Sequence, residues 1–155
     1  MKRSFGGFTL IELVVTLGIF IVLSGVVLIN LSAKRTNVDI VNLTERMSAT
    51  LREAQSNSMA QKNGVAWGVH LENATTTPFY ALYFTSYSPT TTVGYYSFPG
   101  SVSYATSTLA LGATLDILFS QVTGAASAST SINLYMPKQT YYSTILIASS
   151  GAVSY

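Results

Sequence analysis

The sequence predicts an α+β fold, in which one long amino-terminal helix packs on an antiparallel β-sheet head. Two observations support this prediction. No proline occurs before Pro78, and apolar residues follow a helical pattern from Thr9 to Gln61. Beyond Gly64 the period changes to two, and short strand-like runs alternate with turn residues to the end of the sequence.

The first half of the expected helix is almost entirely apolar. The run from Phe8 to Leu31 contains one charged residue, Glu12, and follows a short basic leader that includes Lys2 and Arg3. As a helix the run would be roughly 36 Å long, at about 1.5 Å per residue. This length covers the hydrocarbon core of a bilayer, which is about 30 Å thick, so the run predicts a transmembrane helix.

The second half of the helix, residues 32–63, is expected to be amphipathic and to lie under the sheet. Its apolar residues recur at steps of three and four, and polar residues occupy the other face. The apolar stripe consists of Ile40, Leu43, Met47, Leu51 and Ala54. Asn63-Gly64 is the expected stop, and a break between Ser32 and Asn37 stays open.

Residues 64–155 are expected to form the β-rich head. The expected strands are Val65–Leu71, Phe79–Tyr87, Val93–Phe98, Leu115–Phe119, Ile132–Met136 and Thr144–Ala148. Ser149–Gly151 is typical of a tight hairpin turn and leads into Ala152–Tyr155. The expected loops are Pro89–Thr92, Ser103–Ser107 and Thr123–Thr130.

The composition excludes several classes of function. Charged residues make up only 9% of the 155-residue sequence, and its net charge is +2. From Asn73 onward the only charged residues are Asp116 and Lys138, whereas a nucleic-acid-binding surface needs clustered cations. The sequence has no cysteine, so neither a disulfide nor a thiolate site is possible.

The position of the small residues in the leader is unusual. In an ordinary secretory signal the small-residue cleavage site follows the apolar region, but here Gly6-Gly7 precedes it. The stretch Gly-Phe-Thr-Leu-Ile-Glu-Leu, starting at Gly7, resembles the class III leader of type IV pilins and type II secretion pseudopilins. The resemblance implies that a prepilin peptidase cuts after Gly7 and methylates the new amino terminus at Phe8. The expected domains are then a leader (1–7), a membrane and fibre-core helix (8–31), an amphipathic helix (32–63) and a head (64–155).

The resemblance also implies the location and the partners of the protein. Lys2 and Arg3 before the span are balanced by Lys34 and Arg35 after it, so charge alone does not orient the helix. The family places the leader in the cytoplasm and the head outside the bacterial inner membrane. The implied partners are membrane lipid before assembly, the prepilin peptidase, the inner-membrane assembly platform and other pilin or pseudopilin subunits. The proline that is common late in this helix is missing around Ile29, so no kink is expected there.

Glu12 is the charged residue of the apolar run, and it has two interpretations. In an assembly role, its carboxylate neutralises the new amine at Phe8, within one subunit or between neighbours, and sets the axial register of a fibre. Alternatively, it only complements the positive amino-terminal end of the helix dipole. The flanking motif favours the assembly role.

Gly18 and Gly25 are seven residues apart, which places them on one face of the helix. Small residues let helices approach closely in an apolar environment. We therefore expect these two glycines to take part in helix packing, although tolerated helix glycines are the alternative.

The late part of the sequence resembles the heads of GspH/FimT-like minor pseudopilins. The resemblance rests on the order of Leu115–Phe119, Thr123-Gly124, Ile132–Tyr135, Ile145–Ile147 and Gly151–Val153. It implies a structural subunit of a type II secretion pseudopilus or a type IV pilus. A DNA-binding minor pilin of an uptake machine is one alternative, which the cation-free stretch Gly151–Tyr155 disfavours. A plain membrane anchor that never assembles is another.

The sequence offers no arrangement typical of an enzyme, and no cofactor or metal site is expected. The single histidine, His70, falls on the strand face opposite Trp67 and Val69, where we expect it to be exposed or at an edge. Asp116 is expected to point outward between inward-facing Leu115 and Ile117. The ten tyrosines are expected to serve packing and subunit contacts.

Overall fold

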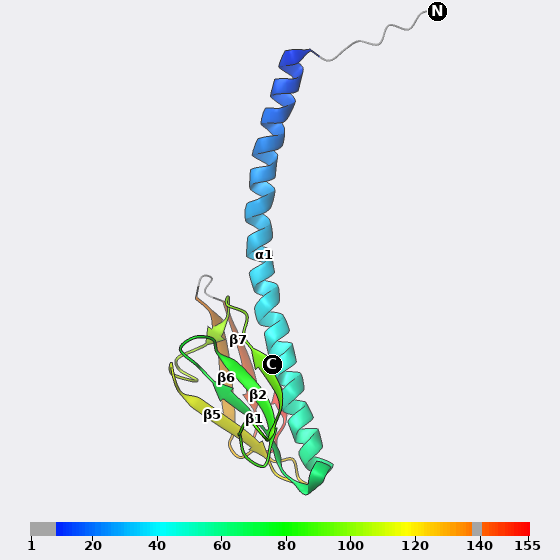
Figure 1. The fold of residues 1–155 in the computed structure, drawn as a ribbon, viewed down its shortest axis with the longest axis vertical. Coiled ribbons are helices and arrows are strands. Elements are labelled where there is room, and N and C mark those ends of the chain that lie inside the picture. Colours follow the sequence, from blue (N-terminus) through cyan, green and yellow to red (C-terminus); the bar gives the residue numbers. More distant parts are fainter. Residues whose placement is uncertain (1–8, 138–140) are drawn as a thin grey trace, which may run out of the picture. The chain divides into compact units, whose positions relative to one another are not determined.

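The structure, a computed structural model, describes residues 9–137 and 141–155, without the side chains of residues 25–37. The chain divides into two compact units, Met1–Thr36 and Asn37–Tyr155. In the described residues, one long helix, α1 (Leu10–Met59), is followed by a short 3₁₀ helix, η1 (Lys62–Gly64), and by eight β-strands (Figure 1). The α+β fold class predicted from the sequence is confirmed, and the arrangement is consistent with the pilin fold.

Helix α1 begins and ends close to the predicted positions. The backbone of Ser32–Asn37 is helical. Helix α1 ends because Gln61, Asn63 and Gly64 adopt positive φ angles of 50°, 61° and 67°. Asparagine and glycine tolerate this left-handed conformation better than most residues, which explains why Asn63-Gly64 predicted the stop.

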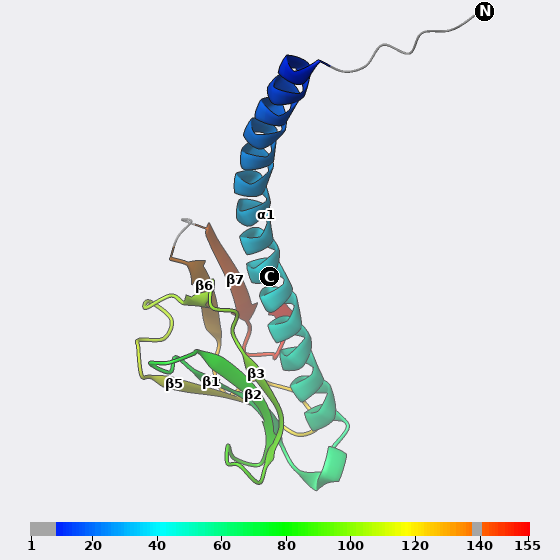
Figure 2. The ribbon, with the colours of Figure 1, turned by 45° about the horizontal axis from the view of Figure 1, so that its top comes forward.

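The strands form two four-stranded antiparallel sheets. Sheet A has the order β3-β2-β1-β5 and consists of β1 (Trp67–Glu72), β2 (Phe79–Phe84), β3 (Thr92–Ser97) and β5 (Thr114–Phe119). Sheet B has the order β4-β6-β7-β8 and consists of β4 (Ser103–Tyr104), β6 (Thr130–Met136), β7 (Tyr141–Ile147) and β8 (Val153–Ser154). Figure 2 shows both sheets beside the carboxy-terminal half of α1.

The strand predictions were wrong at three places. The strand expected to continue to Tyr87 ends at Phe84, because Thr85 has a φ angle of 65°. The expected loop Ser103–Ser107 contains β4, whose Tyr104 is buried and donates a hydrogen bond from its hydroxyl to the Phe79 carbonyl over 3.0 Å. Finally, β7 begins at Tyr141 rather than Thr144, because its pairing with β6 extends to Met136.

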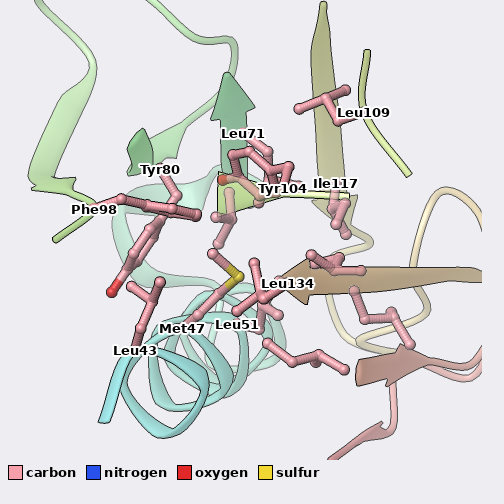
Figure 3. Packing of buried hydrophobic residues seen from close by; sticks show 14 of the residues in the cluster. Leu43, Met47, Leu51, Leu71, Tyr80, Phe98, Tyr104, Leu109, Ile117 and Leu134 are labelled. Carbon is pink, nitrogen blue, oxygen red and sulfur yellow. The ribbon is translucent and has the colours of Figure 1, made fainter. Parts of the chain in front are cut away.

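The core lies between α1 and the two sheets, within the unit Asn37–Tyr155. The predicted stripe on α1, from Ile40 to Ala54, is buried throughout. Figure 3 shows Met47 and Leu51 of this stripe close to Leu134 of sheet B, with Leu71 and Ile117 of sheet A further along the same cluster. One helix face thus covers apolar side chains from both sheets, which explains why its period of three and four extends over several turns.

Polar contacts hold the end of the chain against α1. Arg52 donates a hydrogen bond to the Val153 carbonyl over 3.0 Å, and its guanidinium lies 5.4 Å from the centre of the Tyr155 ring. Gln55 donates to the Gly124 carbonyl over 3.2 Å. The Ser58 hydroxyl accepts a hydrogen bond from the Trp67 backbone N–H over 2.7 Å, which joins the end of α1 to the start of β1.

Candidate functional site

The candidate site is the amino-terminal part of α1, which carries the resemblance described above. Gly7 and Phe8, the predicted cleavage and methylation residues, lie outside the described residues. Thr9 is the first described residue, and its Oγ1 accepts a hydrogen bond from the Glu12 backbone N–H over 3.4 Å. The spacing Thr9-Leu10-Ile11-Glu12 is that of a capping box, in which a hydroxyl side chain satisfies a free N–H of the first helical turn.

Glu12 therefore has a local role in the first turn of α1. A carboxylate in this turn complements the partial positive charge of the helix end. The side chain is exposed, and no ion pair involving it is formed within residues 9–137 and 141–155. The geometry is compatible with both interpretations of Glu12, because an exposed carboxylate remains free to pair with a cation from another molecule.

The surface around Glu12 is continuously apolar. Every large apolar side chain from Leu10 to Leu23 is 54–82% exposed. Monomeric soluble proteins rarely expose contiguous apolar patches larger than a few hundred Å². A surface of this kind is typical of a helix that is covered by lipid or by other helices.

Gly18 leaves a hollow in this apolar surface. The hollow has a volume of about 360 Å³ and is lined by Val15, Gly18, Ile19, Val22 and Leu23. No atom lies within 4 Å of the position that a Cβ of Gly18 would take. Because glycine has no side chain, a second helix can approach α1 closely at this position. Gly25, the other glycine that we expected to take part in helix packing, lies outside the residues whose side chains the structure describes.

The two hydroxyl side chains in this stretch are satisfied without water. Thr16 donates a hydrogen bond to the Leu13 carbonyl over 2.9 Å, and Ser24 donates to the Phe20 carbonyl over 2.7 Å. Such bonds to the preceding turn remove the need for an outside partner. The hydroxyls are therefore compatible with an apolar environment around the helix.

No helix in the part of the chain that the structure describes is long and apolar enough to cross a membrane. The predicted span Phe8–Leu31 extends beyond the described side chains at both of its ends.

The prediction that His70 is exposed or at an edge was wrong. The residue lies on the face of sheet A opposite Trp67 and Val69, as expected, but it is only 4% exposed. Tyr87 covers it, with the two rings stacked at 3.6 Å between their centres. Its Nδ1 lies 2.8 Å from a carboxylate oxygen of Asp116, and its Nε2 lies 3.5 Å from a carboxylate oxygen of Glu72.

These contacts make His70 part of a polar cluster on the outer face of sheet A, together with Asp116, Glu72, Tyr83 and Tyr87. The prediction that Asp116 points outward is confirmed, because its side chain is 51% exposed. Burial and the neighbouring Asp116 carboxylate raise the pKa of Tyr83 to about 12.

The chemistry of this cluster is limited. The Nε2 atom of His70 faces the Glu72 carboxylate, so the His70–Asp116 pair is not arranged to take a proton from a nucleophile. Among the described residues, no group of three or more histidines and carboxylates could hold a metal ion. The cluster therefore fits a structural contact that holds the β2–β3 connection on the sheet.

The sequence prediction overlooked a hollow between α1 and β3. It has a volume of about 530 Å³ and contains the charged side chains of Asp39 and Arg46. Its walls come from the helix on one side and from Tyr80, Tyr96 and Phe98 on the other. No motif marks it, because the two sides are far apart in the sequence.

Comparison with known proteins gives one match. Residues 2–28 match the family described as the prokaryotic N-terminal methylation motif. No curated protein matches the chain. No solved structure matches it either. The match implies processing by a prepilin peptidase, anchoring in the inner membrane before assembly, and assembly with pilins. The chain thus carries, at its amino terminus, the methylation motif that is typical of type IV pilins and pseudopilins.

Proposed function

We propose that this protein is a structural subunit of a type II secretion pseudopilus or a type IV pilus, of the minor pseudopilin kind. The observation that carries the proposal is the exposed apolar surface from Leu10 to Leu23, which Glu12 alone interrupts with a charge. The methylation motif over residues 2–28 supports the same function. The order of strands and glycine turns late in the chain supports the minor, GspH/FimT-like assignment.

The proposed sequence of events follows from the motif. The chain is inserted in the inner membrane as a single-span precursor, with its head outside the cytoplasm. The peptidase removes the leader after Gly7 and methylates the amine of Phe8. The apolar helix then leaves the bilayer for a fibre, in which sister helices replace the lipid.

Glu12 ensures that the helix, when it moves from the lipid into the fibre, stops at the correct axial position relative to its neighbours. A cationic amine at Phe8 and a carboxylate at Glu12 are both costly to leave alone in an apolar surrounding, and they stabilise each other when paired. An incoming subunit would therefore stop where its amine meets the Glu12 carboxylate of a neighbour. The hollow at Gly18 would receive a side chain of the adjoining helix.

Replacement of Glu12 tests the proposal. Glu12→Ala should lower incorporation into fibres by about tenfold or more, which corresponds to losing about 1.4 kcal/mol or more of interaction. Glu53→Ala is the matched control, because it removes an exposed carboxylate from the same helix outside the motif. Incorporation is measured as the amount of the subunit in fibres sheared from cells, relative to the amount in whole cells.

Intact mass of the membrane-extracted protein tests the processing step separately. The expected product begins at Phe8 and carries one methyl group. A product that still begins at Met1 contradicts the proposed processing. Equal incorporation of the Glu12→Ala and Glu53→Ala variants contradicts the role of Glu12 in register.

A further inference from the structure

The outer edge of β3 has the properties of a strand that accepts another strand. Its six residues carry no charge and no proline, and Val93 and Tyr95 are more than half exposed. Exposed edge strands are usually blunted by charged residues, by proline or by shortness, because their free backbone groups pair with other chains. The register with β2 shifts at Val93, which is a bulge, so the regular and unprotected part of this edge is residues 94–97.

The other edges of the two sheets are protected. Strands β4 and β8 have two residues each. The edge of β5 carries Asp116, and the Leu118 carbonyl accepts a hydrogen bond from the Ser127 N–H over 2.8 Å. The part of β7 that extends beyond β8 runs beside α1, where the Thr44 hydroxyl donates to Ser143 over 2.9 Å. The protection of these edges sets β3 apart.

The backbone pairing identifies which groups of β3 are free. The Phe98 N–H donates to the Pro78 carbonyl over 2.9 Å, and Tyr96 is the partner of Tyr80 in the ladder between β2 and β3. In an antiparallel pair, alternate residues direct their N–H and C=O groups toward the partner strand. The backbone groups of Tyr95 and Ser97 therefore point away from β2, and they have no hydrogen-bond partner among the described residues.

The hollow overlooked by the sequence prediction adjoins this edge. Its lining includes Tyr96 and Ser97 from β3, and Arg46 approaches it from α1. Figure 3 shows the Tyr80 ring reaching from sheet A toward Leu43 of α1, with Phe98 beside it. The hollow thus offers aromatic surface next to free backbone groups.

The hollow holds one carboxylate and one guanidinium, and the two differ in their hydrogen-bond partners. The Asp39 carboxylate accepts a hydrogen bond from the Ser101 hydroxyl over 2.9 Å. Arg46 is exposed, and its guanidinium forms no ion pair within the described ranges. A guanidinium with free donors beside tyrosine hydroxyls suits a carboxylate, which it can bind through two parallel hydrogen bonds.

We propose that the open edge of β3 and the adjoining hollow bind an extended segment of a different protein, which adds a strand to sheet A and places a carboxylate against Arg46. Strand addition gives affinity through main-chain hydrogen bonds, and the hollow gives specificity through a side chain.

A second copy of this chain lacks a suitable segment. All six of its side-chain carboxylates lie in α1, β1 or β5. Glu72 is in β1, which is paired on both sides, and Asp116 faces His70. The partner is therefore a different protein, and the site needs no cleavage of the leader.

Hydrogen exchange on the full chain in detergent micelles tests the proposal. The probe is a capped peptide of alternating valine and threonine that contains one glutamate, and its twin contains glutamine instead. The glutamate peptide should slow exchange of the Tyr95 and Ser97 amides by tenfold or more at saturation. Unchanged exchange of these two amides overturns the proposal.

Two pairs of measurements then separate the contribution of the backbone hydrogen bonds from that of the carboxylate contact with Arg46. Tyr95→Pro should abolish binding, whereas Tyr95→Thr should retain it, because both variants lose the ring and only proline lacks the outward N–H. Arg46→Gln should weaken binding of the glutamate peptide about tenfold and leave binding of its glutamine twin unchanged. Equal binding by the two Tyr95 variants overturns strand addition, and equal loss for both peptides overturns the carboxylate contact.

Self-association is measured in the same samples. If the wild-type chain dimerises and Tyr95→Pro abolishes the dimer, the occupant is a second copy and the proposal of a different protein is wrong. The outcome of these binding and self-association measurements does not depend on the fibre assay, because Glu12 and the leader take no part in the site at β3.

Discussion

At the scale of single residues, neighbours that are distant in the sequence decide how a side chain behaves. His70 is an example, whereas Glu12 depends on a neighbour close in the sequence. The surroundings of His70 come from β5 and from the connection after β2, and they bury a residue that alternation placed on an outer face. The described contact of Glu12 is with Thr9, within its own helical turn. Local contacts of this kind can be recognised from spacing alone.

The raised pKa of Tyr83 predicts a loss of stability at alkaline pH. Burial and the Asp116 carboxylate raise its pKa from 10.0 to about 12 in the folded protein. Between these two pH values the unfolded chain loses the phenol proton while the folded protein keeps it. The unfolded state then binds fewer protons, so the free energy of unfolding should fall as the pH rises from 10.0 to about 12.

Tyr83→Phe should reduce the part of this fall that Tyr83 contributes. The measurement is the free energy of unfolding by denaturant across the same pH range. Asp116→Asn should act in the same direction, because it removes the charge that opposes ionisation of the phenol. A slope in Tyr83→Phe identical to that of the wild type would show that Tyr83 ionises equally in both states.

At the scale of elements, the turn before β8 depends on two glycines that approach each other. Gly151 has a φ angle of 88°, and a Cβ at this position would collide with the Gly124 carbonyl oxygen. The same turn contacts Gln55 of α1, which also donates to the Gly124 carbonyl. The turn at Gly151 thus packs against α1 in addition to connecting β7 with β8.

Gly151→Ala should destabilise the protein more than a positive φ angle explains. A non-glycine residue in the left-handed region costs about 1–2 kcal/mol, and overpacking a close contact adds about 1–3 kcal/mol. Gly112→Ala is the matched control, because Gly112 has a φ angle of 78° and nothing lies within 4 Å of the added Cβ. Chemical denaturation measures both variants, and equal losses would contradict the packing contact.

At the scale of the whole molecule, the apolar residues serve two separate purposes. The core cluster begins at Ile40 and draws every member from the unit Asn37–Tyr155. The apolar side chains from Leu10 to Leu23 are exposed instead. The residues that stabilise the head and the residues of the proposed assembly surface therefore occupy different stretches of the same helix.

A fragment of residues 37–155 should therefore fold without the rest of the chain. We expect a cooperative thermal transition with a Tm within a few degrees of that of the full chain, because the fragment contains the complete core cluster. Near-ultraviolet circular dichroism during heating checks this, since buried Trp67 and Tyr104 report on fixed packing. A gradual transition without such a signal would contradict the assignment.

The sequence by itself determined the features that depend on neighbours along the chain. The long helix, its stop at Asn63-Gly64 and the buried stripe from Ile40 to Ala54 follow from the helical period and from residues that tolerate positive φ. Most strands follow from the period of two. The methylation motif, too, is a continuous stretch of sequence.

Only the tertiary structure decided which strands share a sheet, how His70 is covered and where the hollow beside Arg46 lies. Each of these depends on contacts between residues far apart in the chain, such as His70 with Asp116 or Arg46 with the lining contributed by Tyr96. Alternation assigns a side chain to a face of a strand, but it does not say what packs on that face. The physical reason is that strand order and loop placement are selected by burial of the whole core, which no local pattern encodes.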